Sequence, residues 1–162
     1  MIGFCDLMDT YAVLVPTRNR PDKIVNLLKT LSKSTLKPSQ IVVVASGLDI
    51  SEALSSFKNS LPITYLYTEA KGQIAQKKLG VGLVSADIDW CLFLDDDLEI
   101  SPSAVEDALS EAYSYTKDRV VGIGFSLPPT TRTEGANPLV KSVAKLFRID
   151  SNKPGRVARN GH

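Results

Sequence analysis

The stretch WCLFLDDD, residues 90–97, joins a short apolar run directly to three adjacent carboxylates. The run 90–94 predicts a buried β-strand. Adjacent carboxylates repel one another. Oxygen ligands of this kind suit a hard divalent cation. The end of the strand therefore predicts a metal site whose ion holds phosphate oxygens, and the alternative is a solvated acidic turn that caps the next helix.

Segments typical of strands and of helices alternate on both sides of this stretch. Apolar runs predict strands at 12–16, 41–45, 90–94 and 120–125, and the run 41–45 is typical of a parallel strand covered on both faces. Residues 63–68 alternate between apolar and polar and predict a further strand. Apolar residues at helical spacing predict helices from Pro21, around 50–57, over 73–85 and from Ser101. The alternation predicts an α/β fold with a doubly wound, mostly parallel sheet flanked by helices and joined by right-handed crossovers.

Polar segments follow three of the predicted strands. They are residues 17–20, Ser46-Gly47, and the acidic segment 95–97. Ligands of doubly wound sheets bind beyond the carboxyl ends of the strands. We therefore expect these three segments, which are distant in sequence, to converge in space.

The composition places limits on the class of protein. A chain of 162 residues is long enough for one domain with a sizeable core, and its net charge of +1 gives no reason to expect nucleic acid as a partner. Of the two cysteines, Cys5 and Cys91, the second falls in the apolar run and is expected to be a reduced core residue. No apolar run approaches the ~20 residues of a membrane span, and the first residues do not resemble a signal peptide, so a cytoplasmic location is expected.

The pattern changes after Phe125. Residues 127–138 predict a loop of about a dozen residues, which is long enough to suggest a function. A short helix is expected next, with a basic stripe of Lys141, Lys145 and Arg148. We interpret the stripe as an exposed helix face, and the alternative is weak attraction to a membrane surface.

Four segments, in order, resemble the N-terminal half of family 2 glycosyltransferases, enzymes with a GT-A fold. They are VLVPTRNRPDKIVNLLKTL, QIVVVASG, KGQIAQKKLGVGLVSADIDWCLFLDDD and SPSAVEDAL, which together span residues 13–109. The resemblance implies a Rossmann-like fold of the GT-A type in a single domain, 1–162. Residues 11–125 would form the nucleotide-sugar-binding core. Residues 126–162 would supply a loop, a short helix and the start of the acceptor side, so that the fold would be incomplete at its C-terminus.

The resemblance also implies roles for individual residues. Contacts to a nucleotide-diphosphate-sugar donor would come from Pro16, Thr17, Asn19, Arg20, Ser46, Gln76, Lys77 and Asp96, the last at the ribose. Asp97 would ligate Mn²⁺ or Mg²⁺ directly. Asp95 would contact the ion through a water molecule, or would support the direct ligands from outside the coordination sphere. Lys77 replaces the family's Arg and would act as a point charge near the diphosphate. Ser46 stands where many members have an Asp that contacts uracil, so the base stays open.

The implied reaction is transfer of a sugar to an acceptor hydroxyl with inversion, assisted by the metal, in polysaccharide biosynthesis. A divalent cation would neutralise the charge on the departing nucleotide diphosphate. No catalytic base is recognisable, and Glu134 is the one loose carboxylate in the loop after the predicted strand 120–125. We therefore expect a donor-binding half that transfers little sugar by itself.

Three alternatives stand beside this interpretation. The chain is a non-catalytic nucleotide-sugar-binding fragment, or a subunit that depends on a partner, or a nucleotidyltransferase. The last is disfavoured because the loop at 16–19 lacks glycines. The expected partners of a glycosyltransferase are an acceptor glycan or a lipid-linked sugar, with peripheral contact at the inner face of the membrane and self-association as further expectations.

Overall fold

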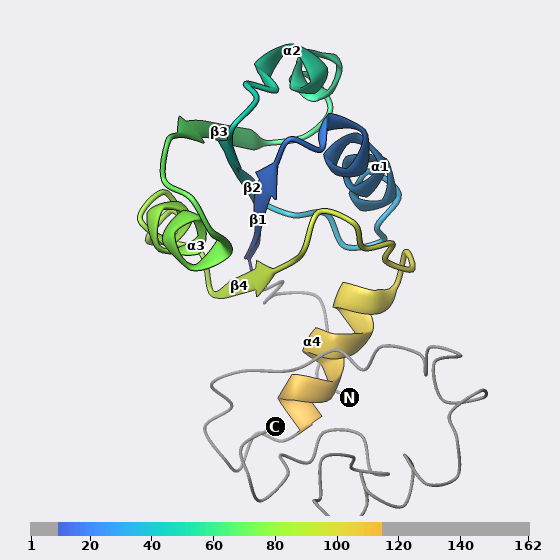
Figure 1. Cartoon of the computed structure of the whole chain (residues 1–162). Coiled ribbons are helices and arrows are strands. Elements are labelled where there is room, and N and C mark those ends of the chain that lie inside the picture. Colours follow the sequence, from blue (N-terminus) through green and yellow to red (C-terminus); the bar gives the residue numbers. More distant parts are fainter. Residues whose placement is uncertain (1–9, 115–162) are drawn as a thin grey trace, which may run out of the picture. The chain divides into compact units, whose positions relative to one another are not determined.

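The structure, a computed structural model, describes residues 10–114 of the chain (Figure 1). The sheet and the helices packed on it belong to the compact unit Met1–Leu109, and of the second unit, Ser110–His162, only the last residues of one helix are described. Several predicted features therefore lie outside the described residues: the strand 120–125, the loop 127–138, Glu134, and the basic stripe of Lys141, Lys145 and Arg148. The single domain 1–162 stays a prediction.

Strands and helices alternate throughout residues 10–114. They are β1 (Tyr11–Arg18), α1 (Pro21–Leu31), β2 (Gln40–Ser46), α2 (Ser51–Leu54), the short 3-10 helix η1 (Ser55–Phe57), β3 (Ile63–Thr68), α3 (Gln73–Val81), β4 (Trp90–Phe93) and α4 (Ala104–Ser114). Every strand and helix predicted within these residues is present. The predicted α/β fold is confirmed.

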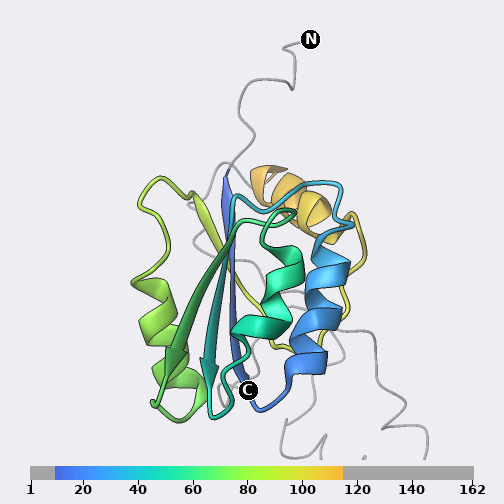
Figure 2. The ribbon, with the colours of Figure 1, turned by 90° about the horizontal axis from the view of Figure 1, so that it is seen from above.

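The four strands form one parallel sheet in the order β3-β2-β1-β4. The chain moves outward from β1 to β3 and then returns past β1 to add β4 on its other side. Helices α1 and α2 cover one face of the sheet and α3 covers the other (Figure 2). The direction of winding reverses between β1 and β4, and open α/β sheets bind ligands at the carboxyl end of such a reversal.

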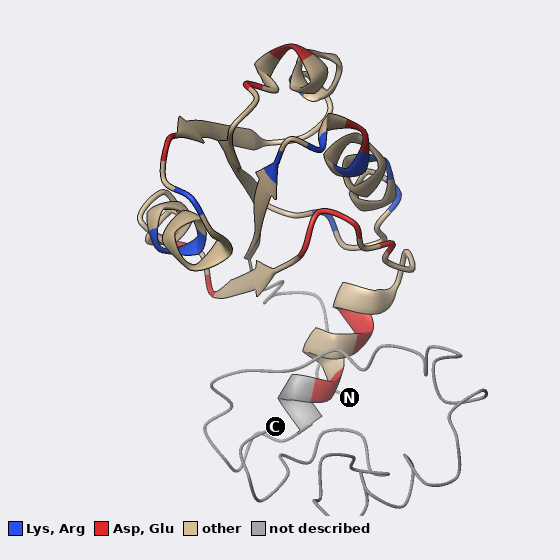
Figure 3. Cartoon of the chain, in the orientation of Figure 1, with Lys and Arg blue, Asp and Glu red and all other residues tan. Residues whose placement is uncertain are grey.

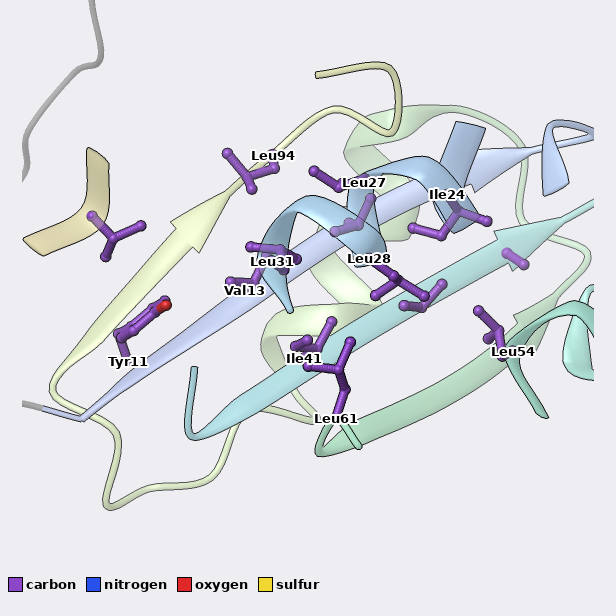
Figure 4. Close-up of a cluster of buried hydrophobic side chains, with 14 of the residues drawn as sticks. Tyr11, Val13, Ile24, Leu27, Leu28, Leu31, Ile41, Leu54, Leu61 and Leu94 are labelled. Atoms are coloured by element: carbon purple, nitrogen blue, oxygen red, sulfur yellow. The ribbon is translucent and has the colours of Figure 1, made fainter. Parts of the chain in front are cut away.

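Alternate residues of β1 and β2 build two separate cores. One face packs against α1, where Val13 and Ile41 meet Leu27, Leu28 and Leu31 (Figure 4). The other face carries a smaller cluster of Leu14, Val42 and Val44, with Leu66 and Val84 packed against it. Because both faces are covered, β1 and β2 are apolar at successive positions, which is the pattern that predicted them.

Two predicted helices are shorter or tighter than expected. Helix α3 ends at Val81, four residues before the predicted end at residue 85. The backbone N–H of Leu83 donates to Gly80 O at 3.0 Å, so the chain leaves the helix in a tight turn. Two glycines, Gly80 and Gly82, account for this because glycine is the weakest helix former after proline. The helix predicted around 50–57 is α2 followed by η1.

The predicted burial of β4 is wrong for alternate residues. β4 is an edge strand of the described sheet, and α3 packs on β1 and β2. Trp90 and Leu92 face the core beside α1, but Cys91 is exposed and Phe93 is 47% exposed. Cys91 is therefore a free thiol at the surface of the described part of the chain, and the expectation of a core cysteine is wrong.

A close contact between α3 and β1 gives the first testable prediction. A Cβ at Gly80 would lie 2.8 Å from Leu14 Cδ1 and 2.9 Å from Leu14 Cγ. We expect Gly80→Ala to lower the free energy of unfolding by about 1–2 kcal/mol, because overpacking outweighs the gain in helix propensity. The matched control is Gly82→Ala, whose Cβ would meet nothing closer than Leu79 O at 3.4 Å. Urea unfolding should show the control unchanged or more stable by up to about 1 kcal/mol; equal losses in both variants would contradict the packing argument.

Candidate functional site

A buried carboxylate joins the ends of β1 and β4. The side chain of Asp96 is 0% exposed, and its Oδ2 accepts a hydrogen bond from Thr17 Oγ1 at 2.6 Å. Arg20 Nη2 lies 2.7 Å from Oδ1 as an ion pair, although no N–H of Arg20 is aligned with that oxygen. A buried charge is tolerated when it is paired in this way. The structure thus places Asp96 as the group that positions Thr17 and Arg20, and its predicted contact with a ribose stays a prediction.

The carboxylates on either side of Asp96 are half-exposed. Asp97 Oδ2 accepts a hydrogen bond from Arg20 Nη1 at 3.4 Å. Asp95 Oδ1 accepts one from Gln73 Nε2 at 3.2 Å and lies 3.7 Å from Lys77 Nζ. Figure 3 shows the acidic stretch after β4 in red and the basic residues at the end of β1 and on α3 in blue. Each of the two outer carboxylates therefore faces a cation from a different element.

The segment at the end of β2, Ser46-Gly47, is held against the segment 17–20 at the end of β1. Asn19 has a φ of 56°, and its Oδ1 accepts a hydrogen bond from the backbone N–H of Leu48 at 2.8 Å. Gly47 has a φ of 81°, and a Cβ there would lie 2.2 Å from Asn19 Oδ1. Only glycine fits this position, for both reasons. The segments at 17–20, 46–47 and 95–97 converge as expected, with Asn19 engaged in holding two of them together.

Ser46 lies at the same edge with a buried hydroxyl. Its Oγ has no hydrogen-bond partner among the described residues. A buried polar group without a partner is uncommon in proteins, so this hydroxyl has hydrogen-bonding capacity that the described residues do not use. The loop that follows Ser46 is fixed by Asp49, which accepts hydrogen bonds from Ser51 N at 2.9 Å and Tyr65 Oη at 2.7 Å. The backbone N–H of Ser51 and the Tyr65 hydroxyl lower the pKa of Asp49.

Helix α3 is anchored to the sheet by a buried glutamine. Gln76 Nε2 donates to Thr17 O at 2.8 Å and to Val44 O at 2.9 Å, so one side chain ties α3 to both β1 and β2. Gln73 and Lys77 lie on the same helix face, one turn apart, and both reach Asp95. Gln73 is a residue of the site that the predicted donor contacts do not include, and its spacing of four from Lys77 is the available signal in the sequence.

The outer carboxylates fit a hard divalent cation. Residues 10–114 hold no group of three acidic, histidine or cysteine side chains arranged around one point. Magnesium-like ions in phosphate-transfer sites commonly use one or two carboxylates, and complete their coordination with water and substrate phosphates. Asp95 and Asp97 supply oxygen ligands of this kind, and each is about half exposed, at 49% and 48%. Their donor chemistry matches the predicted Mn²⁺ or Mg²⁺.

Residues 12–157 match the sequence profile described as Glycosyl transferase family 2. The chain belongs to this family. Two relatives, named as uncharacterized glycosyltransferases, are from Haemophilus influenzae and, as YwdF, from Bacillus subtilis. They are each 28% identical to this chain over 98 and 102 residues, which cover 60% and 62% of it. The matches cover 33% and 37% of the relatives, so this family 2 chain spans about a third of the curated relatives it matches.

Solved glycosyltransferase structures share the fold. S. aureus TarS superimposes with a TM-score of 0.59 at 22% identity, covering 74% of this chain and 23% of TarS. A mannosyltransferase from Pyrobaculum calidifontis, solved with GDP-Man and Mn²⁺, gives 0.57 at 20% identity and covers 72% of this chain and 35% of its own. The predicted Rossmann-like GT-A fold is confirmed. Of the helices in residues 10–114, none has the length and apolar composition that a membrane span requires.

The anchoring role of Gln76 can be tested against its neighbour on the helix. We expect Gln76→Leu to lower the free energy of unfolding by about 1–3 kcal/mol, because the carbonyls of Thr17 and Val44 lose their donor inside the protein. The control is Gln73→Leu, whose side chain is exposed and whose loss water compensates, with a change within about 0.5 kcal/mol. Chemical denaturation of both variants provides the measurement. A stable Gln76→Leu protein would show that the buried bonds do not anchor α3.

Proposed function

We propose that this chain binds a nucleotide-diphosphate-sugar together with Mn²⁺ or Mg²⁺, and that it forms the donor side of an inverting glycosyltransferase. The observation that carries the proposal is the cluster at the reversal point of the sheet. There the half-exposed Asp95 and Asp97 flank the buried Asp96, and Arg20 and Lys77 stand beside them. A metal ion binds carboxylates and a diphosphate binds cations, so a metal-diphosphate group needs negative and positive side chains at one place.

Different side chains would bind the metal and the phosphates. Asp97 and Asp95 would hold the cation, which when bound acts as a Lewis acid toward the departing diphosphate. Arg20 and Lys77 would orient the phosphate oxygens. Charge placed in advance where negative charge develops is commonly the largest contribution to catalysis of this kind. Thr17 and Asp96 would act by keeping the Arg20 guanidinium in position.

The donor class is supported by the structures that share the fold. TarS has been solved with UDP and with UDP-GlcNAc, and the P. calidifontis enzyme with GDP-Man. We extend the nucleotide-sugar class to this chain and leave the base open between uracil and guanine. Ser46, with its unpartnered hydroxyl, is the residue we propose for a contact to the nucleoside.

The acceptor belongs to the same proposal. We propose a glycan or lipid-linked sugar as acceptor, in polysaccharide biosynthesis on the cytoplasmic side of a membrane. Membership of family 2 supports sugar transfer in general. Self-association belongs to the proposal as well, and Ile74, at 87% exposed, and Phe93 are exposed apolar side chains that such a contact would cover.

A second candidate is a donor-binding part without turnover of its own. Within the described residues, each carboxylate of segment 95–97 faces a cation, and Asp49 is engaged by Ser51 and Tyr65. Each of these carboxylates therefore has a charged or hydrogen-bonding partner, and none stands out as a general base. Glu134, the one base candidate from the sequence, lies outside the described residues.

Metal-dependent nucleotide binding is the direct test of the donor site. We expect UDP or GDP with Mn²⁺ to raise the melting temperature, since ligand at a hundredfold excess over its Kd stabilises the folded state by ~2.7 kcal/mol. Asp97→Ala should remove the Mn²⁺-dependent part of that shift. Glu99→Ala, which removes an exposed carboxylate two residues further on, should keep it. Thermal shifts that are equal in wild type and Asp97→Ala would reject the metal assignment.

Turnover separates the two candidates. We expect the 162 residues to bind donor but to transfer sugar slowly, because a missing general base lowers the rate by roughly 10²–10⁴-fold. A donor-consumption assay with a broad acceptor panel measures this directly. Rapid transfer that disappears in Asp97→Ala would show that the base lies within this chain, and Glu134→Gln would then be the first variant to examine.

A further inference from the structure

The ion pairs formed by Arg20 and Lys77 differ in their N–O distance and in the burial of the carboxylate. Arg20 Nη2 lies 2.7 Å from Asp96, whose side chain is fully buried. Its other nitrogen, Nη1, lies 3.4 Å from the half-exposed Asp97. Lys77 Nζ lies 3.7 Å from the half-exposed Asp95. One contact is therefore short and protected, and two are long and in contact with solvent.

Exposed and buried ion pairs differ in how readily they exchange. Long, solvated pairs contribute little to stability, so a competing ion replaces them at low cost. A pair with a buried carboxylate is costly to break because the charge is left without a partner. The exchangeable contacts are thus Arg20–Asp97 and Lys77–Asp95. Arg20 remains fastened to Asp96 when its contact with Asp97 is lost.

We propose that Arg20 and Lys77 serve as internal counter-ions of the metal-free site and are handed over to the diphosphate when the metal binds. The inference rests on the proposed function. In the free protein, these cations neutralise Asp97 and Asp95, the two carboxylates assigned to the metal. Asp97 and Asp95 would hold the metal, and Arg20 and Lys77 would then be left to pair with the phosphate oxygens.

The exchange couples the two ligands. Metal alone must displace two ion pairs, and diphosphate alone must draw the same cations away from their carboxylates. Each ligand therefore removes a cost that the other would meet, so each raises the affinity for the other by the same factor. Couplings of this kind are typically about 5–150-fold. Direct contact between metal and phosphate contributes as well, so the inference concerns the share that depends on Lys77 and Arg20.

The test measures the dissociation constant of Mn²⁺ for the whole chain with and without saturating UDP or GDP, from the electron paramagnetic resonance signal of free Mn²⁺. Lys77→Gln removes the cation beside Asp95, which keeps its hydrogen bond from Gln73. We expect this variant to bind Mn²⁺ alone about two- to fivefold more tightly, as the loss of one exposed pair implies. The same variant should bind the diphosphate more weakly. The coupling factor should fall by about two- to fivefold for the same reason.

Two matched controls, Lys78→Gln and Arg18→Lys, separate the exchange of ion pairs from a general change in charge. They accompany the test variants Lys77→Gln and Arg20→Lys. Lys78→Gln removes an exposed lysine one residue along the same helix, so a long-range field effect would alter Mn²⁺ affinity equally in both variants. Arg20→Lys keeps the charge beside buried Asp96 and keeps the protein folded, but a point charge does not span two carboxylates. We expect Arg20→Lys to tighten the binding of Mn²⁺ alone and to weaken the coupling. Arg18→Lys, two residues earlier at the end of β1, should change neither.

The outcomes distinguish this inference from the function on which it rests. A wild-type chain that binds neither Mn²⁺ nor diphosphate would overturn both. A wild-type chain that binds both ligands, with Lys77→Gln no different from Lys78→Gln in Mn²⁺ affinity and in coupling, would overturn the counter-ion exchange and leave the donor site in place. Tighter Mn²⁺ binding and weaker coupling in Lys77→Gln and Arg20→Lys, with both controls unchanged, is the result that supports it.

Discussion

Asp96 directs its carboxylate into the protein at the point where β1 and β4 end. The group is fully buried, yet it has only a hydroxyl from Thr17 and a guanidinium from Arg20 as polar partners among the described residues. A buried charge of this kind is tolerated only while its partners stay in place. The pairing therefore fixes the loop after β1 relative to the loop after β4. The half-exposed positions of Asp95 and Asp97, and the reach of Arg20 across two carboxylates, both depend on it.

Hydrogen bonds behind the charged residues keep this arrangement in register. Gln76 joins the ends of β1 and β2 to α3, and Asn19 joins the loop after β1 to the loop after β2. These side chains bond to backbone, which moves less than another side chain would. Binding sites need a supporting shell of this type to hold charged groups within a fraction of an ångström. The polar residues of the site thus include several whose role in this structure is to hold others.

Most of the fold could be predicted because its signals are local. Runs of apolar residues at 12–16 and 41–45 predicted buried strands, and the order of elements predicted the parallel sheet. The exposure of Cys91 and Phe93 could not be predicted in this way, because an apolar strand at the edge of the described sheet has the same local sequence as a central one. The end of α3 was misplaced for a related reason. Gly80 weakens the helix, but Leu83 and Val84 continue its apolar pattern.

The site was predicted less completely than the fold, since a motif indicates which residues gather and not how they share contacts. Sequence position placed Asn19 and Asp96 among residues that touch the donor, while the structure engages both within the protein. Gln73 is missed because its one signal in the sequence is the spacing of four from Lys77, and a glutamine in the first turn of a helix is not distinctive by itself. Contacts across the switch point depend on the register of β1 against β4, and register is a tertiary property.

The chemical difference between Arg20 and Lys77 matches the partners that each side chain contacts. Arginine presents a planar fork that meets two acceptors at once, and lysine presents one strongly hydrated charge on a flexible stem. The fork stands where two carboxylates of different burial must be contacted, Asp96 and Asp97. The lysine stands at the first helical turns of α3, opposite a single exposed carboxylate that Gln73 also holds. Arg20 is therefore held by a fully buried partner, whereas the described charged partner of Lys77 is a half-exposed carboxylate.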